Sequence, residues 1–244
     1  MQLPLRSVAV SAVLAFAAGL TVASFATFRT FLPGLLQGAS ITVEITLGGC
    51  ALAVVAAVSA ALAKLYGPWP LRWLAVVYIE IFRGTSALVQ LFWLFFVLPH
   101  FGVTLAPLTV AILTLGLNVG AYGAEVVRGA VAAVPRGQWE ATLALNMTLA
   151  QALRRIVLPQ AMVAMIPPWG NLFIELLKST ALVSLITIAD LSFMAQEMNQ
   201  TTMKTIDIFT LVLLIYLAIS LAITITMRLL ENAVSRGLAR GRAH

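Results

Sequence analysis

Residues 128–160 read RGAVAAVPRGQWEATLALNMTLAQALRRIVLPQ and form a polar island with four arginines inside an otherwise apolar chain. Pro135 suits the first turn of a short helix. Asn146 follows where that helix should stop, because Asn tolerates the left-handed conformation that ends helices. Thr148 and Gln151 have the spacing of a capping box and predict the start of a second short helix.

The second helix is expected to end at Leu158–Pro159, since the position before a proline disfavours helix. The chain must then change direction before it enters the next apolar segment. Two short helices that lie at an angle to each other and connect two apolar segments indicate a docking element for a cytosolic partner. The alternative is an interfacial helix that rests on lipid headgroups.

The composition excludes a soluble fold. The chain has 244 residues, of which 61% are hydrophobic and 10% charged, whereas soluble domains hold about 25% charged residues. We therefore expect an all-α polytopic membrane protein. The net charge of +6 does not indicate a nucleic-acid partner, because the cations lie in loops and at segment ends, where membrane proteins carry them.

A helix needs about 20 apolar residues to cross a bilayer. The apolar segments predict about six transmembrane helices, with a tight turn at 99–102 between the third and fourth. The first segment could instead be a signal peptide, but its long apolar core and the lack of a cleavage site favour a retained helix. The helices are expected near 8–28, 36–63, 73–98, 105–128, 160–188 and 206–229.

The basic residues predict the orientation. With six spans and both termini in the cytoplasm, only Arg29 and Lys204 of the loop and terminal cations face the other side. This orientation also places the 129–159 loop in the cytoplasm. The cytoplasmic set is Arg6, Lys64, Arg72, Arg128, Arg136, Arg154, Arg155, Arg228, Arg236, Arg240 and Arg242.

The loop resembles the EAA loop in permease subunits of bacterial binding-protein-dependent ABC importers. The family pattern is roughly E-A-A, three residues, G, nine residues and I-x-L-P. The chain matches it with Glu140-Ala141-Thr142, Asn146 and Ile156-x-Leu158-Pro159. It departs from it twice, with Thr142 in place of Ala and Asn146 in place of Gly.

Three further stretches resemble the polar amino acid branch of these permeases: EIFRGTSALVQ at 80–90, NVGAYGAEVVRG at 118–129 and PPWGNLFIELLKST at 167–180. The resemblance covers roughly 33–232. It leaves 1–32 as an N-terminal transmembrane helix outside the family core and 233–244 as a basic cytoplasmic tail. The runs VVYIEIFRGTSALVQLFWLFFVLP and IPPWGNLFIELLKSTALVSLI look most like permeases for ectoine and hydroxyectoine.

The resemblance implies a five-helix type I importer core plus one N-terminal helix, in the bacterial inner membrane. It implies a transport subunit that works by alternating access with a dimer of ATPase subunits, a second permease, homologous or identical, and a periplasmic substrate-binding protein. ATP and Mg would bind the ATPase, since this chain has no phosphate-binding loop and is expected to bind no cofactor. The substrate would be a polar amino acid or related zwitterion, with ectoine or hydroxyectoine expected first and glutamate, glutamine, arginine or histidine open.

The resemblance also implies that the first short helix docks in a groove of the ATPase, as helix-in-groove recognition would require. Trp139 and Leu143, four residues apart, are expected to share its apolar face. Glu140 lies beside them, and Gly137 would permit close approach of another backbone. The expected ATPase coupling residues are Gly137, Trp139, Glu140, Ala141, Leu143, Asn146, Leu158 and Pro159.

Three acids precede a base by three residues in or near the membrane, which lets each pair meet on one helix face. The pairs are Glu80 with Arg83, Glu125 with Arg128, and Glu175 with Lys178. They are either structural, neutralising themselves, or members of a polar path.

Pro167 and Pro168 are expected to break or kink the fifth helix, either at a transport site or as a packing kink. Gly34-x-x-x-Gly38 and Gly116-x-x-x-Gly120 permit close helix contact. The candidate substrate-pathway residues are Gln90, Asn118, Glu125, Asn171 and Glu175.

Other functions find little support in the residues. Cys50, His100 and His244 supply too few ligands for a metal site and no nucleophile with its base. An ion-coupled secondary transporter would leave the loop without a purpose, and the chain shows no internal repeat. A membrane assembly or anchor protein would not need charges within its spans.

Overall fold

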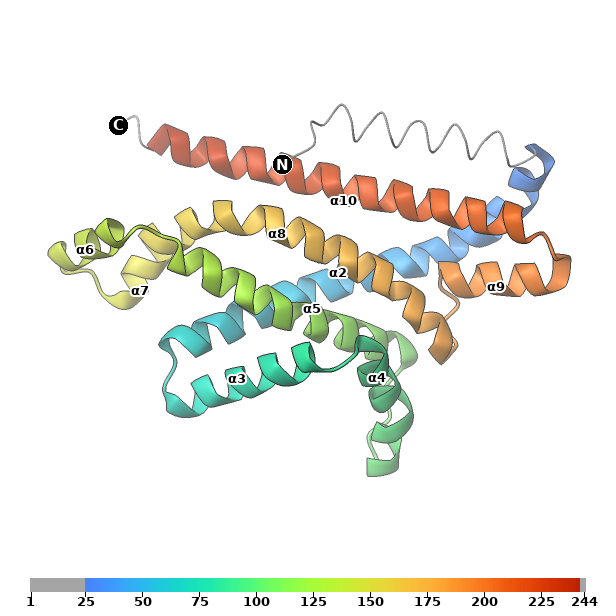
Figure 1. Ribbon diagram of the computed structural model, residues 1–244, viewed down its shortest axis with the longest axis horizontal. Coiled ribbons are helices and arrows are strands. Elements are labelled where there is room, and N and C mark those ends of the chain that lie inside the picture. The colour runs from blue at the N-terminus through green and yellow to red at the C-terminus, as the bar shows by residue number, and fades with distance from the viewer. Residues whose placement is uncertain (1–24, 242–244) are drawn as a thin grey trace.

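The computed structural model describes the backbone of residues 25–241 and the side chains of 29–235, and this part of the chain contains helices and turns but no strand. Wide π-helical turns at Trp93–Val97 and Leu153–Val157 and 3-10 turns at Leu98–Phe101 and Thr180–Ile186 extend some of the helices. The α-helices (Figure 1) are α2 Phe25–Tyr66, α3 Trp69–Gly84, α4 Ala87–Phe92, α5 Pro107–Ala132, α6 Arg136–Ala144, α7 Leu149–Ala152, α8 Leu158–Ser179, α9 Leu191–Thr202 and α10 Thr205–Gly241.

Four helical runs are long and apolar enough to cross a membrane, and the bent pair α3–α4 makes a fifth. They correspond to the predicted helices 36–63, 73–98, 105–128, 160–188 and 206–229. The predicted helix 8–28 lies almost wholly outside the described residues. The all-α membrane fold is therefore confirmed over the described part of the chain.

Two predicted boundaries are wrong. Helix α2 begins at Phe25 instead of near 36 and continues through Pro33, because Phe31 and Leu35 are buried against α9 and α10 and hold that turn in place. The predicted helix 73–98 is broken, since α3 and the run from Ala87 to Phe101 meet at 107°. The sequence places Gly84 at this break, where a helix is weakest.

The helix end predicted at Pro159 is wrong, and of the break or kink predicted at Pro167 and Pro168 the break does not occur, while the kink stays a prediction. The helical run does not end at Pro159, because the Leu153–Val157 turn widens and lets α7 run on into α8. Helix α8 likewise continues through Pro167 and Pro168. Prolines are tolerated inside membrane helices where neighbouring groups compensate for the lost hydrogen bond.

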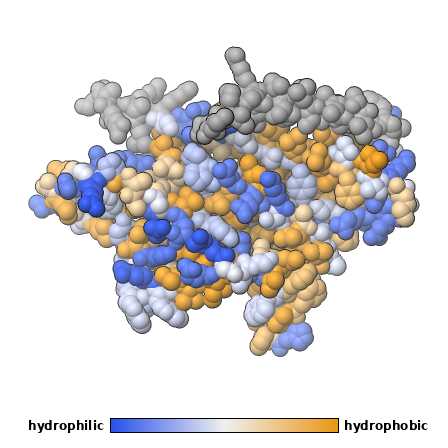
Figure 2. All heavy atoms as spheres, viewed as in Figure 1, coloured by the Kyte–Doolittle hydropathy of each residue, from blue (hydrophilic) through white to orange (hydrophobic). Residues whose placement is uncertain are grey.

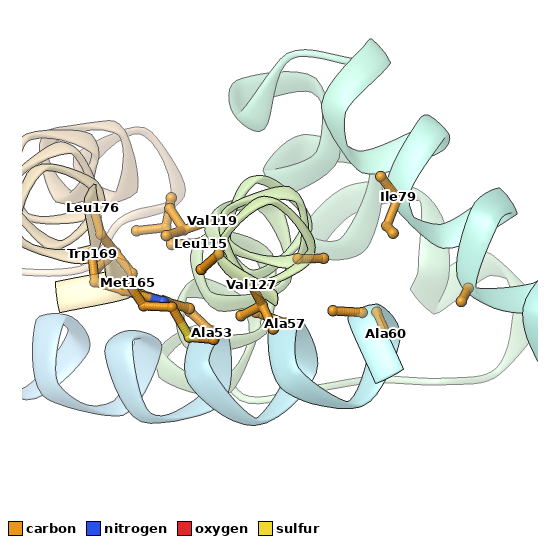
Figure 3. Close-up of a cluster of buried hydrophobic side chains, with 14 of the residues drawn as sticks. Ala53, Ala57, Ala60, Ile79, Leu115, Val119, Val127, Met165, Trp169 and Leu176 are labelled. Carbon is orange, nitrogen blue, oxygen red and sulfur yellow. The ribbon is translucent and has the colours of Figure 1, made fainter. Parts of the chain in front are cut away.

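The main core lies where α5 crosses α2, with α3 and α8 packed against the pair (Figure 3). Small residues let the backbones approach: Ala53 and Ala57 of α2 are fully buried. A Cβ added at Gly116 would lie 3.0 Å from the Gly49 carbonyl oxygen, and one at Gly120 would lie 3.0 Å from the Ala56 Cβ. The Gly116–Gly120 motif therefore makes the close helix contact predicted for it.

A second core joins α2, α9 and α10. Here the Gly34–Gly38 motif faces α9, which the sequence did not predict. A Cβ at Gly38 would lie 2.7 Å from the Asp190 carbonyl oxygen. The start of α9 is thus pressed against the α2 backbone.

The elongated bundle has two polar ends. Helices α6 and α7 project at one end, hereafter the loop end, and α9 lies at the other. Figure 2 shows hydrophilic residues gathered over both ends and also over α3 and α5, between apolar surfaces.

Candidate functional site: the α6–α7 loop and the exposed polar residues of the spans

The α6–α7 loop has the local structure that its sequence predicts. Helix α6 directly follows Pro135 and ends one residue before Leu145. Asn146 adopts the left-handed conformation, with φ 51°. The Thr148 N–H donates to Gln151 Oε1 at 2.9 Å and the Gln151 N–H to Thr148 Oγ1 at 3.3 Å, which confirms the capping box.

Trp139 and Leu143 lie one turn apart on α6 but differ in their surroundings. The Trp139 ring packs against the main core and lies 6.4 Å from the Tyr66 ring at the end of α2. Leu143 is 74% exposed and Leu145 is 72% exposed. The large aromatic side chain of α6 therefore turns towards the bundle, and the leucines form the free tip.

The side of α6 that faces away from the bundle is open. Glu140 and Ala141 are exposed, and a Cβ added at Gly137 would have no neighbour within 4 Å. The exposed Leu143 and Leu145 lie beyond them at the C-terminal end of α6. These positions present small, acidic and apolar groups on one short helix.

One further hydrogen bond fixes α6 to the bundle, and a second one lies within α6. The Gln160 Nε2 group donates to Gln138 Oε1 at 3.0 Å and joins α8 to α6. Thr142 is buried, and its hydroxyl donates to the Trp139 carbonyl at 2.7 Å. Leu158 and Pro159, half-buried, begin α8 just beyond the wide turn. The loop is therefore a folded part of the bundle.

Glu125 is the centre of an ion-paired cluster. Its Oε2 lies 2.7 Å from Arg128 Nε, so this pair meets as predicted. Its Oε1 lies 2.8 Å from Lys64 Nζ on α2, a contact that the sequence analysis missed. Lys64 and Glu125 lie near the C-terminal ends of two apolar segments, and parallel packing of those segments was the signal that could have joined them.

The other two acid–base pairs do not form among the described residues. Glu80 and Arg83 are exposed, and the Arg83 guanidinium instead lies 5.5 Å from the centre of the Tyr122 ring, a favourable cation–π distance. Glu175 and Lys178 are also exposed and make no ion pair with any side chain of residues 29–235. Of the two alternatives for these pairs, self-neutralisation holds for Glu125 with Arg128 only.

Gln90 and Asn118 stabilise the break between α3 and α4. The carbonyl of Phe82 accepts from Gln90 Nε2 at 3.0 Å and from Asn118 Nδ2 at 2.9 Å. Gln90 Nε2 also donates to Thr85 Oγ1 at 2.7 Å, and Asn118 Nδ2 to Gln90 Oε1 at 3.2 Å. These side chains supply partners for backbone groups that the break releases from the helix.

Asn171 and Glu175 lie elsewhere, on an exposed face of α8 that Lys178 continues. Their spacing of four and three residues places them on one stripe of the helix. The five candidate pathway residues therefore fall into three groups: the Glu125 cluster, the α3–α4 break and the α8 stripe.

The described residues contain no cluster of three His, Cys, Asp or Glu side chains able to hold a metal ion.

A buried polar junction at the α9 end was not predicted. Asp190 is fully buried and accepts from the N–H groups of Phe193 at 2.9 Å and Ser192 at 3.2 Å, so it caps α9. Thr42 Oγ1 on α2 accepts from the Leu191 N–H at 3.1 Å. Asp190 lies between the candidate spans. Burial raises the pKa of its carboxyl above the ordinary value, and the N–H groups that donate to it offset only part of that rise.

Comparison with known proteins agrees with this architecture. Residues 51–236 match the family described as binding-protein-dependent transport system inner membrane component. The chain belongs to that family and is a permease, a multi-pass transport component with the type I ABC permease fold.

Among curated relatives, the chain is 44% identical to the probable amino-acid ABC transporter permease protein y4tF of Sinorhizobium fredii, over 86% of this chain and 90% of that protein. It is 38% identical to the L-cystine transport system permease protein TcyB of Bacillus subtilis, over 87% and 91% of the two chains. It is 36% identical to the glutamine transport system permease protein GlnP of Escherichia coli, over 82% and 92%.

Among solved structures, a chain of an amino acid ABC transporter crystallised with histidines matches at 32% identity and a TM-score of 0.78, over 86% of this chain and 98% of that one. The methionine ABC transporter MetNI in an inward-facing conformation matches at 20% identity and a TM-score of 0.63, over 86% and 99%, and supports the fold alone.

Proposed function

We propose that this chain is the membrane-spanning subunit of an importer for a polar amino acid or a related zwitterion, driven by a separate ATPase that docks on the α6–α7 loop. The observation that carries the proposal is the exposed leucine tip of a loop that is otherwise fixed to the bundle. Leu143 and Leu145 are the free end, whereas Trp139, Gln138 and the wide turn before α8 tie the helix to the spans.

The proposed partners follow from that arrangement and from the family. The docking surface is Gly137, Glu140, Ala141, Leu143 and Leu145, and it fits an apolar groove with a hydrogen-bond donor for the carboxylate. ATP and Mg would bind the ATPase pair. A second permease, homologous or identical, and a periplasmic substrate-binding protein complete the assembly, with the loop end in the cytoplasm and membrane lipid around the spans.

The substrate class rests on charges that form no ion pair among the described residues. Glu175, Lys178, Glu80 and Arg83 are exposed on two spans, and ionised groups at membrane depth need a polar path or another chain beside them. Acid and base side by side suit a zwitterion, which carries both charges. The relatives named above are amino acid permeases, so an amino acid is the leading substrate, and ectoine, without support among them, is the competitor to test.

The docking proposal is tested with the assembled complex in lipid. Leu143→Ser together with Glu140→Lys should reduce substrate-stimulated ATP hydrolysis by about tenfold or more while the chain still inserts. Leu71→Ser, at an exposed leucine in the first turn of α3, is the matched control and should leave stimulation unchanged. Normal stimulation in the double variant would exclude the tip as the docking site.

The substrate and the energy source are tested in the same proteoliposomes. ATP hydrolysis is measured with the binding protein loaded in turn with glutamine, cystine, histidine, arginine, glutamate or ectoine. Stimulation by an amino acid and not by ectoine supports the leading assignment, and the reverse result assigns ectoine. Uptake driven by an ion gradient without ATP would instead establish a secondary transporter.

A further inference from the structure

Three hydroxyl groups meet where α8 ends and α9 begins, at the end of the bundle away from the loop (Figure 1). The Tyr216 hydroxyl on α10 lies 3.4 Å from Thr180 Oγ1, directly after α8. It also lies 3.2 Å from Ser192 Oγ, in the first turn of α9. Residues 180–192, hereafter the α8–α9 strap, are thus tied to α10 at both ends by one phenol group.

The direction of these hydrogen bonds follows from the single proton that each hydroxyl carries. Thr180 donates its proton to the Leu177 carbonyl at 2.7 Å, so it accepts from Tyr216. Tyr216 has then used its own proton and accepts from Ser192. The chain of bonds runs in one direction, from α9 through α10 to α8, and removal of the central hydroxyl breaks both ties at once.

The strap carries backbone strain between its two ties. Thr187 has φ 62° and ψ 24°, the left-handed conformation, which is a genuine outlier for a β-branched residue. Such a conformation persists only where the surrounding structure holds it. Val183 and Ile186 before it are fully buried in the main core, and Asp190 after it caps α9. The two Tyr216 bonds complete this support at the ends of the strap.

We propose that Tyr216 is a positioning residue for transport: by closing the α8–α9 strap, its hydroxyl fixes the end of α8 that carries the α8 stripe. Lys178 of that stripe lies two residues before Thr180, and Glu175 lies three residues further back. A strap released from α10 lets this end of α8 shift, so the charged side chains lose their place on the substrate path. The Tyr216 ring packs in the second core, and its effect is therefore exerted through α8. This inference rests on the proposed role of the α8 stripe in transport.

A distance measurement tests the strap directly. Spin labels at Leu185 of the strap and Leu213 of α10, both exposed, are introduced into a chain with Cys50→Ser, in the assembled complex in lipid. Tyr216→Phe keeps the ring and removes only the hydroxyl. It should broaden the distribution of inter-label distances, because the strap is then free to leave its strained conformation.

Two further variants make the distance test specific. Ser220→Ala is the matched control on the same helix, since the Ser220 hydroxyl bonds only to the Leu217 carbonyl within α10, and it should leave the distribution unchanged. Thr187→Gly removes the strain, because glycine adopts positive φ without steric cost. Combined with Tyr216→Phe, it should narrow the distribution again. An unchanged distribution in Tyr216→Phe, or a combined variant as broad as Tyr216→Phe alone, would overturn the proposal.

The transport test measures substrate molecules taken up per ATP hydrolysed, in proteoliposomes with loaded binding protein. The probe is the radiolabelled form of the compound that stimulates hydrolysis most in the substrate test above. Tyr216→Phe should lower this ratio by about fivefold, the factor to which the loss of one ordinary hydrogen bond corresponds, and adding Thr187→Gly should restore it.

The ratio separates positioning from folding. A variant that merely folds poorly lowers uptake and hydrolysis together, so an unchanged ratio would refute the positioning role even if the distances broaden. A wild-type complex without stimulated hydrolysis would instead refute the importer proposal, on which the distance measurement does not depend.

Discussion

At the scale of single residues, some polar side chains of this permease pair with other residues and stabilise the fold, whereas others are exposed and can contact a substrate. Glu125, the best candidate for a pathway acid by position, is held by Lys64 and Arg128. Glu175 on α8 is open. A residue that already has two ionic partners is poorly placed to bind a substrate. The acid predicted to contact the substrate is therefore Glu175 of α8 instead of Glu125 of α5.

The α8 stripe is therefore expected to be sensitive to loss of charge. Glu175→Gln should lower uptake by about tenfold while leaving thermal stability within about 0.5 kcal/mol, since an exposed side chain contributes little to folding. Radiolabelled uptake and thermal unfolding in detergent are measured together. Glu197→Gln, an exposed acid on α9, should affect neither property. A stability loss comparable to the uptake loss would identify Glu175 as structural.

Asp190 gives a prediction for stability and its pH dependence. Asp190→Ala removes the cap of α9 and should cost roughly 1–2 kcal/mol, whereas Asp190→Asn keeps an acceptor and should cost less. Because the folded-state pKa is raised, the wild-type carboxyl contributes stability below its ordinary pKa and loses that contribution as pH rises through the raised value.

Thermal unfolding of the Asp190 variants is compared at several pH values. Asp190→Asn should gain stability relative to the wild type as pH rises above the acidic range, because it cannot ionise. A constant difference between the two proteins at every pH would show that the carboxyl has an ordinary pKa in the fold.

Gly38 tests the junction between α2 and α9. An alanine there would place its Cβ 2.7 Å from the Asp190 carbonyl oxygen, and backbone atoms have little room to yield. Gly38→Ala should destabilise the protein by roughly 1–3 kcal/mol. Gly129→Ala, where no atom lies within 4 Å, should be neutral or slightly stabilising because alanine favours helix. Equal melting temperatures for both variants would contradict the close approach.

At the scale of elements, the bend between α3 and α4 depends on side chains from outside the break. Gln90→Leu should remove one hydrogen-bond donor from the Phe82 carbonyl and one from the Thr85 hydroxyl. Losing such bonds costs about 1–3 kcal/mol each. Hydrogen exchange of the amides around 84–88 is expected to quicken by about tenfold or more. Unchanged exchange there, with exchange at the α9 end as the internal reference, would show that Asn118 alone holds the bend.

The sequence predicted elements well where one local rule decides the outcome. Apolar length located the five testable spans, and the left-handed Asn146 and the Thr148–Gln151 capping box followed from side-chain chemistry alone. It failed where packing overrides a local preference. Pro33 stays within α2 because Phe31 and Leu35 pack against α9 and α10, and Pro159 stays within a helical run because the turn before it widens. Helix α9 was also missed, although its cap, Asp190, bonds to the N–H groups of the helix's own first turn.

The candidate site was predicted by residue type more successfully than by arrangement. The loop residues lie together as expected, but the inward turn of Trp139 depends on where α2 ends. The pairing of Lys64 with Glu125 depends on helix packing across 61 positions of sequence. Such facts are set by tertiary contacts, and spacing along one helix does not contain them.

At the scale of the whole molecule, the Lys64–Glu125–Arg128 cluster links α2 to α5 near the loop end. A double-mutant cycle with Lys64→Met and Glu125→Gln should give a coupling energy of about 1 kcal/mol, because the side chains are only partly exposed. Thermal unfolding of the four proteins supplies the cycle. Lys204→Met combined with Glu125→Gln is the control and should be additive, since Lys204 lies at the opposite end of the bundle.

The small-residue contact between α2 and α5 has one more consequence. Ala53, Ala57, Gly116 and Gly120 bring the two backbones together with no long side chains to rearrange, and tightly packed surfaces of this kind do not deform gradually. The two helices should therefore travel as one rigid body during the transport cycle. The sliding surfaces are then to be sought at the edges of that body, where α8 and α10 meet it through larger and more adaptable side chains such as Met165, Trp169 and Met227.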